Sequence, residues 1–419
     1  LVVLPVLYHL VFSRKRKSGG GRRSPIVAGM IGLLVVAGGS ARAQHSVLSL
    51  DSAVGRALRS YPAITAAELN VRQQEALRRT AFQLDPGSAQ FQHGQINSGY
   101  GRDYSLQATT GIPFPTVIAR RASYLKESVR LAESEQLTTR AVVKESVSAA
   151  YMQWATAHDQ LRLLQRLDSA YASLAAFATR KFDAGETGRL ESVLARSRSD
   201  RLHVQRRSAE SDLLIFAAEL ERWTGALNGA DPDTASVISM ARAPDPGGGT
   251  DPVLAAEQQR ALQLEEEWKL QRSQWAPSLQ GGGFYQTLDG DAPFSGYLIG
   301  AWIPLPGSGQ GARTKAARLR SEMARQQLEE LRRERHGELL RTRTQLAQLR
   351  ESLAYYESTG ASLATTLRTD AERAYRAGEI GYLEFIQGIE QAYRTDTEYL
   401  RVRYELALTV LHLRALMGL

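Results

Sequence analysis

The chain has 419 residues and a formal net charge of +8, and seven basic residues placed before residue 44 account for all but one of these charges. The remainder is close to neutral, which excludes a broad basic face for nucleic acid. The chain contains no cysteine, so disulfides, thiolate metal sites and a lipid-modified N-terminal cysteine are excluded as well.

Residues 1–43 are predicted to be a secretory signal with an upstream extension. Basic residues stand at 22 and 23, an apolar stretch rich in small residues covers 26–39, and residues 41–43 match an A-x-A cleavage site. The apolar stretch is too short for a stable membrane span, although a retained anchor is the alternative. No other apolar run is long enough to cross a membrane, so any crossing would require strands closed into a barrel.

Helix and strand patterns follow one another in a fixed order after the signal. Apolar residues at 3-4 spacing predict helices, and polar/apolar alternation predicts strands. The elements expected first are a helix over 51–84 that Pro62 divides, strands over 89–97 and 104–113, and helices over 116–181 and 190–224. Residues 228–250, rich in Pro, Gly, Asp and Ala, are predicted to be a linker.

The same order then repeats. The elements expected after the linker are a helix over 253–274, strands over 279–288 and 295–305, and helices over 312–376 and 381–417. We therefore expect one structural repeat over 44–227 and a second over 251–419. In each repeat two shorter helices match the long one in length, so they should stack end to end beside it. Four strands are too few to close a barrel, which indicates a ring of several chains.

The clearest sign of duplication is a short stretch that occurs twice, 193 positions apart. Residues 182–191 read FDAGETGRLE, and residues 375–384 read YRAGEIGYLE. An aromatic residue, Ala, Gly, Glu, Gly, Leu and Glu stand at matching positions. The glycines are expected to let one helix end and the chain reverse into the next. A plain helical-hairpin turn is the alternative interpretation, but the single fixed offset favours duplication.

No catalytic or metal-binding pattern is present. The seven histidines are scattered, with no i, i+4 pair and no H-E-x-x-H. The three glycines at 281–283 lack the following Lys that a phosphate loop requires. We therefore predict a protein that is not an enzyme and has neither a cofactor nor a metal site. Tyr297 and Trp302 are candidates for an interfacial aromatic girdle, with ordinary packing as the alternative.

From about residue 49 to residue 419 the organisation resembles that of the TolC-type outer-membrane efflux proteins. The resemblance rests on the duplicated order, Pro-Ser-Leu at 277–279 before a strand, Ile-Pro-Leu at 303–305 after a strand, and the two aromatic-x-Ala-Gly-Glu turns. It implies a mainly α fold with a small β part. Long antiparallel coiled-coil helices would form an α-helical barrel, and four strands per chain would contribute to a 12-stranded trimeric β-barrel.

The same resemblance implies a function and partners. A homotrimer would sit in outer-membrane lipid, extend into the periplasm, and passively conduct substrates as the exit duct of a tripartite efflux pump. Its partners would be a periplasmic adaptor (membrane fusion) protein and an inner-membrane pump of the resistance-nodulation-division type. The alternative function is a periplasmic coiled-coil adaptor or structural protein without a pore, which would not need the duplicated hairpins.

The resemblance also assigns roles to residues of the two turns. The residues expected to contact the adaptor at the periplasmic tips are Gly185, Glu186, Gly188, Gly378, Glu379 and Gly381. The pore entrance and its gating are expected to involve Glu191, Glu384 and Tyr375. The two glutamates are equally explained as acids favoured at helix N-termini, and the two roles are compatible. Ile380 and Gln387 stand where a basic and an acidic residue are usual, so the usual closing salt-bridge network is not implied.

The transported substrate stays open at this point. Rings of carboxylates at Glu191 and Glu384 would attract cations. Residues 111–117 and the short mature chain are similar to family members that accompany heavy-metal-cation pumps. Drugs, dyes and secreted peptides are the alternative cargo, because such ducts are usually unselective.

Overall fold

The computed structural model describes residues 47–96, 102–288, 293–304, 307 and 309–419. The predicted secretory signal and its cleavage site lie outside the described residues. Most of the loop of each β-hairpin lies outside them too, and so does Leu305. Within the described part of the chain, no helix is both long and apolar enough to cross a membrane.

The described elements follow the predicted order and, with one exception, agree with the predicted bounds to within three residues. The first group is β1 (Val47–Leu48), α2 (Leu50–Ser60), α3 (Pro62–Arg78), a 3₁₀ turn (Arg79–Phe82), β2 (Ser88–Gly94), β3 (Asp103–Ile112), α4 (Pro115–Asp183) and α5 (Arg189–Thr224). The second group is β4 (Asp231–Pro232), α6 (Ala235–Ala241), α7 (Pro252–Ser273), β5 (Ser278–Thr287), β6 (Pro293–Trp302), α8 (Gln310–Tyr355), a π turn (Tyr356–Gly360), α9 (Ala361–Ala377) and α10 (Tyr382–Leu416).

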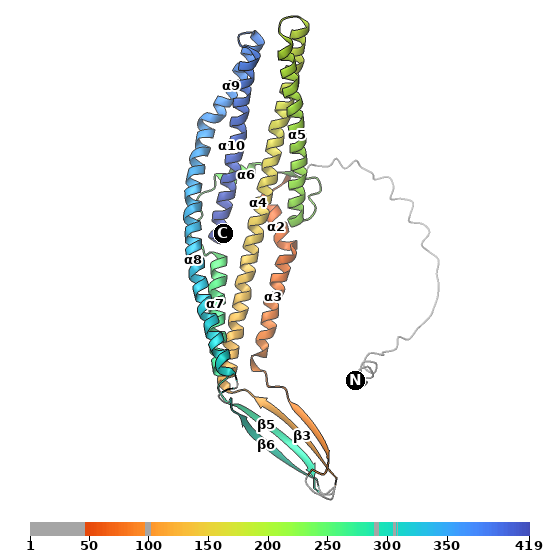
Figure 1. Cartoon of the computed structure of the whole chain (residues 1–419), viewed down its shortest axis with the longest axis vertical. Helices are drawn as coiled ribbons and strands as arrows, with labels where there is room; N and C mark the ends of the chain where they lie inside the picture. Colours follow the sequence, from red (N-terminus) through yellow and green to blue (C-terminus); the bar gives the residue numbers. More distant parts are fainter. Residues whose placement is uncertain (1–46, 97–101, 289–292, 305–306, 308) are drawn as a thin grey trace, which may run out of the picture. The chain divides into compact units, whose positions relative to one another are not determined.

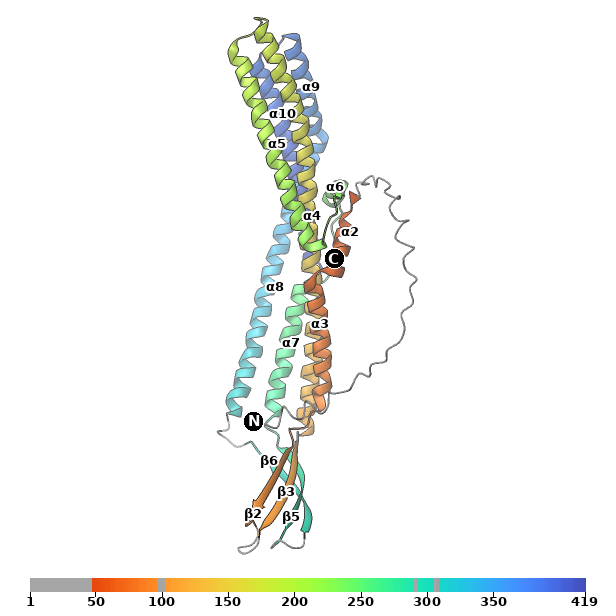
Figure 2. The same cartoon turned by 90° about the vertical axis from the view of Figure 1, so that its right-hand side faces the viewer.

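The helices pack as the predicted lengths indicated. The 69-residue α4 is about 100 Å long at 1.5 Å per residue. It contacts α3 along one part of its length and α5 along another, while α7 and α10 lie in the same manner beside α8. Figure 1 shows the α4/α5 and α9/α10 pairs side by side at the end remote from the strands, and Figure 2 shows α7 and α8 running towards the sheet.

The predicted linker over 228–250 is not extended throughout, because its first part, from β4 through α6, is packed against the helices. Tyr151 on α4 anchors the segment, because its hydroxyl donates to the Leu48 carbonyl at 2.6 Å and accepts from the Asp233 amide at 3.0 Å. Two further buried residues, Val237 and Ala241, come from α6 and join the core cluster that α2, α4 and α10 also supply. Composition alone indicates a linker and cannot reveal this packing, which depends on partners far away in sequence.

The second long helix, predicted to be continuous over 312–376, is interrupted. α8 ends at Tyr355, a π turn follows, and α9 begins at Ala361. A Cβ atom on Gly360 would lie 2.9 Å from Cδ1 of Tyr356 and 3.4 Å from Cγ2 of Thr395 on α10. A side chain at position 360 would therefore require the Tyr356 ring of the same turn to shift, whereas the distance to α10 is that of an ordinary van der Waals contact. The prediction of a continuous helix was wrong at this turn. A π turn inserts one residue locally and leaves the apolar pattern on either side intact, so that pattern does not reveal it.

The π turn is tied to the segment between the repeats. The Arg242 guanidinium pairs with Glu357 of the π turn at 2.8 Å. Arg350 of α8 pairs with Asp245 at 2.7 Å and donates to the Ala243 carbonyl at 3.0 Å. These contacts fix residues 242–245 across the place where α8 gives way to α9.

The four long strands form one antiparallel sheet in the order β2-β3-β5-β6. Cross-strand partners share a face, so the register defines two faces. The apolar face, as we call it, contains Phe91, Leu106, Ala108, Ile112, Leu279, Tyr285, Tyr297, Ile299 and Ala301, together with the polar residues His93, Thr110, Thr287 and Ser295. The polar face contains Ser88, Gln90, Gln92, Ser105, Gln107, Thr109, Gln280 and Gln286, together with Phe284, Phe294, Leu298 and Trp302.

The two girdle candidates lie on opposite faces of the sheet. Tyr297 is 83% exposed on the apolar face. Trp302 is on the polar face, where its Nε1 donates to Oε1 of Gln280 at 3.1 Å. Their separation of five positions is odd, and side chains at odd separations in a strand point in opposite directions. The two residues therefore do not form one girdle.

Candidate functional site

Each predicted tip turn is a Schellman motif, the arrangement in which a left-handed residue ends a helix. Gly185 has φ +75° and donates to the Phe182 carbonyl, while Glu186 donates to the Lys181 carbonyl. The second turn is built in the same way, with φ +77° at Gly378. There the amides of residues 378 and 379 donate to the carbonyls of residues 375 and 374. Glycine is favoured at these two positions because a Cβ atom penalises the left-handed backbone.

The second glycine of each turn has a different structural role from the one predicted. Gly188 and Gly381 have φ −74° and −75°, which any residue adopts, and they form the N-caps of α5 and α10. A Cβ atom at either position would meet nothing within 4 Å. These two glycines are therefore not needed for the chain reversal itself. All six predicted adaptor-contacting residues are exposed.

Glu191 connects the two tips within one chain. One carboxylate oxygen accepts a hydrogen bond from the Tyr375 hydroxyl, and the other accepts from the Thr187 hydroxyl. Thr187 belongs to the first turn, whereas Tyr375 lies on α9, next to the second turn. The structure thus brings together two of the three predicted gating residues and adds Thr187 as a residue that the sequence analysis did not assign to the site.

The aromatic surroundings of Tyr375 explain why its hydroxyl is a donor. The ring is 2% exposed and stacks on Phe385 with a centroid separation of 4.8 Å. Phe177 meets it edge-on at 5.9 Å, and the Lys181 ammonium lies 5.4 Å from its centroid. Burial, followed by the bond to Glu191, raises the pKa of Tyr375 well above its ordinary value. The phenol therefore keeps its proton and can hold the carboxylate.

Glu384 lies at the start of α10 and is not joined to this pair. Its carboxylate accepts from the Gly381 amide at 3.3 Å, which satisfies the N-cap amide at the start of the helix. This contact accords with the helix-dipole interpretation of the residue. Since Glu384 is exposed, its carboxylate remains accessible to solvent.

A second link between the tip helices lies deeper along them. Arg198 on α5 pairs with Glu390 on α10 at 2.6 Å. The buried Tyr382 hydroxyl lies close to these charges, and burial raises its pKa to about 12. Both charged side chains are about 40% exposed, so the pair is worth at most about 1 kcal/mol. No local motif marks it, because the partners are far apart in sequence.

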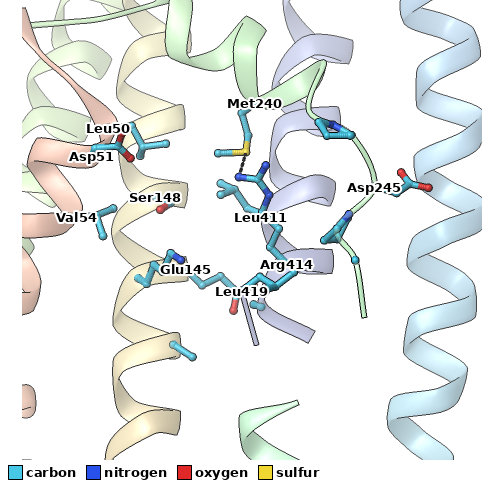
Figure 3. A pocket seen from close by; sticks show the side chains of 16 residues that line it. Leu50, Asp51, Val54, Glu145, Ser148, Met240, Asp245, Leu411, Arg414 and Leu419 are labelled. Carbon is cyan, nitrogen blue, oxygen red and sulfur yellow. Dashed lines mark hydrogen bonds between the residues drawn. The ribbon is translucent and has the colours of Figure 1, made fainter. Parts of the chain in front are cut away.

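A separate pocket of about 480 Å³ lies where α2, α4, α6 and α10 converge (Figure 3). One of its two basic lining residues, Arg414, donates to the sulfur of Met240 at 3.4 Å. Asp245, also in the lining, is already paired with Arg350. None of the predicted site residues lines this pocket. Among the described residues there is also no group of three or more His, Asp or Glu placed to hold a metal ion.

A family model matches the later part of the chain. Residues 249–419, which include the second predicted repeat, match the family model described as outer membrane efflux protein. No curated protein sequence matches the chain.

Solved outer-membrane channels share the fold of this chain over most of its length. The CmeC outer membrane channel of Campylobacter jejuni is 15% identical, with a TM-score of 0.73 over 88% of this chain and 85% of that chain. VceC of Vibrio cholerae is 15% identical, with a TM-score of 0.71 over 87% and 96%. The open state of the Neisseria gonorrhoeae MtrE channel is 13% identical, with a TM-score of 0.68 over 88% of each chain. The mainly α fold with a small β part is thereby confirmed.

Proposed function

We propose that three copies of this protein form the exit duct of a tripartite efflux pump, with their sheets in the outer membrane and their helices in the periplasm. The observation that carries the proposal is the two-faced sheet. Its apolar face suits lipid, its polar face suits a water-filled lumen, and its four strands cannot close without other chains. A periplasmic adaptor without a pore has no use for such a sheet.

The exposed tip turns are the proposed docking points for a periplasmic adaptor. Both turns present the same backbone geometry and an exposed glutamate, Glu186 or Glu379. They differ in the residue that follows, Thr187 or Ile380, so a trimer would present alternating polar and apolar turns. An inner-membrane pump of the resistance-nodulation-division type would complete the assembly and supply the energy.

The contact between Tyr375 and Glu191 is the proposed gate element. It joins the first helical hairpin to the second at the tips, where widening of the tunnel would require the hairpins to separate. A hydrogen bond to a carboxylate is worth about 1.5 to 3 kcal/mol, enough to bias a two-state equilibrium by one to two orders of magnitude. Opening would exchange this contact for solvent or for the adaptor.

Cations are the proposed preferred ions of the entrance. In a trimer Glu191 and Glu384 would each provide three carboxylates in a narrow ring, which attracts cations and repels anions. Metal cations are therefore a candidate cargo, and drugs are the other. Glu384 is the better placed of the two glutamates for this role, because it is exposed whereas both oxygens of Glu191 accept bonds from neighbouring side chains.

Membrane fractionation and planar-bilayer recording test the duct itself. We expect the mature protein in the outer-membrane fraction and ion-conducting trimers in bilayers. Protein that stays in the soluble periplasmic fraction and gives no conductance would overturn the proposal.

Substituting the two glutamates tests the ion preference. Glu384→Gln with Glu191→Gln should reduce cation preference, read as a shift of reversal potential in a salt gradient. Glu379→Gln, an exposed tip glutamate outside the proposed ring, is the control. An unaltered reversal potential in the double variant would contradict the acidic-ring role. Deletion of the gene, followed by growth on divalent metals and on hydrophobic drugs, identifies the cargo.

A further inference from the structure

Charge is distributed unevenly between the two ends of the helices. Where the helices meet the sheet, residues 78–88, 113–121, 272–278 and 302–315 contain seven basic residues and one acidic residue, Asp85. We call these basic residues the collar: Arg78, Arg79, Arg120, Arg121, Arg272, Arg313 and Lys315. At the tips, residues 178–192 and 370–384 contain five basic and seven acidic residues. The nearly neutral chain is therefore polarised, with its positive end beside the sheet.

The collar charges are poorly neutralised within the chain. Arg120 approaches Glu266 only at 3.9 Å, and Arg121 donates to a backbone carbonyl, that of Gln83, at 3.3 Å. Among the described residues, the other five collar members have no carboxylate within ion-pairing distance. By contrast, Arg318 and Arg320, which follow the collar residues of α8, each pair with a glutamate at 2.8 to 2.9 Å.

Helix stability accounts for only part of the collar. Arg78 and Arg272 lie in the last turns of α3 and α7, where the helix dipole favours a basic side chain, but the collar residues of α4 and α8 lie at the opposite ends of their helices. α4 and α8 begin at the sheet, and neither has an acidic residue in its first turn. Instead Arg120 and Arg313 lie within the first two turns, next to the positive end of the helix dipole. This placement costs stability in water, whereas a bound anion would be attracted both by the side chains and by the exposed helix amides.

The residues between the collar and the apolar face suit a membrane interface. Phe82 is 67% exposed, Ile303 is 67% exposed and Trp275 is 41% exposed, all at the junction of helices and sheet. Trp and Phe at such a level are typical of the boundary between lipid tails and headgroups. The order from the sheet towards the helices is thus apolar face, exposed aromatic residues, and basic side chains. Lipid presents the matching order of tails, interface and phosphates.

We infer that the collar binds the phosphates of anionic phospholipid headgroups in the leaflet of the outer membrane that faces the periplasm. The inference rests on the proposed duct, because only a sheet inserted in the membrane places the collar at headgroup level. Each basic side chain near an anionic lipid surface contributes about 1 kcal/mol. The collar would thereby set the depth of insertion and attract anionic lipid around the trimer.

Lipid binding by the purified trimer tests the inference. The trimer is reconstituted into vesicles of phosphatidylcholine mixed with phosphatidylglycerol, re-extracted, and analysed for retained lipid by native mass spectrometry. We expect enrichment of phosphatidylglycerol over phosphatidylcholine, with affinity falling about fivefold for each charge removed in Arg313→Gln with Lys315→Gln. The matched control is Arg333→Gln with Arg341→Gln, which should leave the enrichment unchanged. Both arginines are exposed, lie on α8 away from the sheet, and have no ion-pair partner among the described residues.

Conductance in neutral phosphatidylcholine bilayers separates the two proposals. Wild-type channels that conduct normally but retain no more phosphatidylglycerol than the collar variant would overturn the lipid-binding inference. They would leave the proposed duct function unaffected. A collar variant that keeps its lipid enrichment but shifts the reversal potential would place the charges in the lumen and also overturn the lipid-binding inference. Protein that neither inserts nor conducts in any bilayer would instead overturn the duct.

Discussion

The hydrogen bond between Tyr375 and Glu191 gives the sharpest test of the proposed gate. Tyr375→Phe removes the hydroxyl that holds the carboxylate and keeps the ring that stacks on Phe385. Because the acceptor is charged, the lost bond is worth about 1.5 to 3 kcal/mol. If this bond exists only in the closed arrangement, the ratio of open to closed channels should rise by about 10-fold to 150-fold.

Single-channel recording measures this ratio directly. Tyr171→Phe is the matched control, since Tyr171 is buried in the same apolar cluster and its hydroxyl makes no hydrogen bond in the described part of the chain. That variant should leave the open fraction unchanged. A Tyr375→Phe channel that opens as rarely as the wild type, alongside a Tyr375→Ala channel that opens freely, would show that ring packing holds the tips and would refute the hydrogen-bond reasoning.

Three further predictions concern the backbone of the tips, the partly exposed His412 and the π turn. Gly378→Ala should destabilise the second tip by about 1 to 2 kcal/mol because residue 378 has a left-handed φ, whereas Gly381→Ala should be neutral. Hydrogen exchange of the tip amides measures both effects. Equal effects would contradict the assignment of the left-handed position to residue 378. His412 lies 2.9 Å from each of two glutamates, which raise its pKa. Its charged form therefore stabilises the fold at low pH, and the melting temperature should fall as pH rises from about 6.5 through the raised pKa. His412→Gln should flatten this pH dependence. A variant that keeps the same dependence would disprove the pairing. Arg242→Gln should loosen the π turn because it removes the ion pair with Glu357. The amides of the turn should then exchange faster, with little change in melting temperature. Unchanged exchange would count against a stabilising role of this ion pair.

Local patterns were enough to predict much of the molecule. The order of helices and hairpins, the division of the first helix at Pro62 and the positions of both tip turns were all confirmed. Apolar periodicity and the backbone limits of Gly and Pro act within a few residues, so they can be read from one sequence. The glutamates and the tyrosine were also identified from the turns, although their roles remain proposals.

Only the tertiary structure decided which distant residues meet. Glu191 and Tyr375 are 184 positions apart and Arg242 and Glu357 are 115 apart, and no local pattern links either pair. The two faces of the sheet required the register of four strands, which is fixed by pairing between hairpins rather than within them. The tip turns were thus determined locally, whereas the contact that joins them arises from the packing of two helical hairpins.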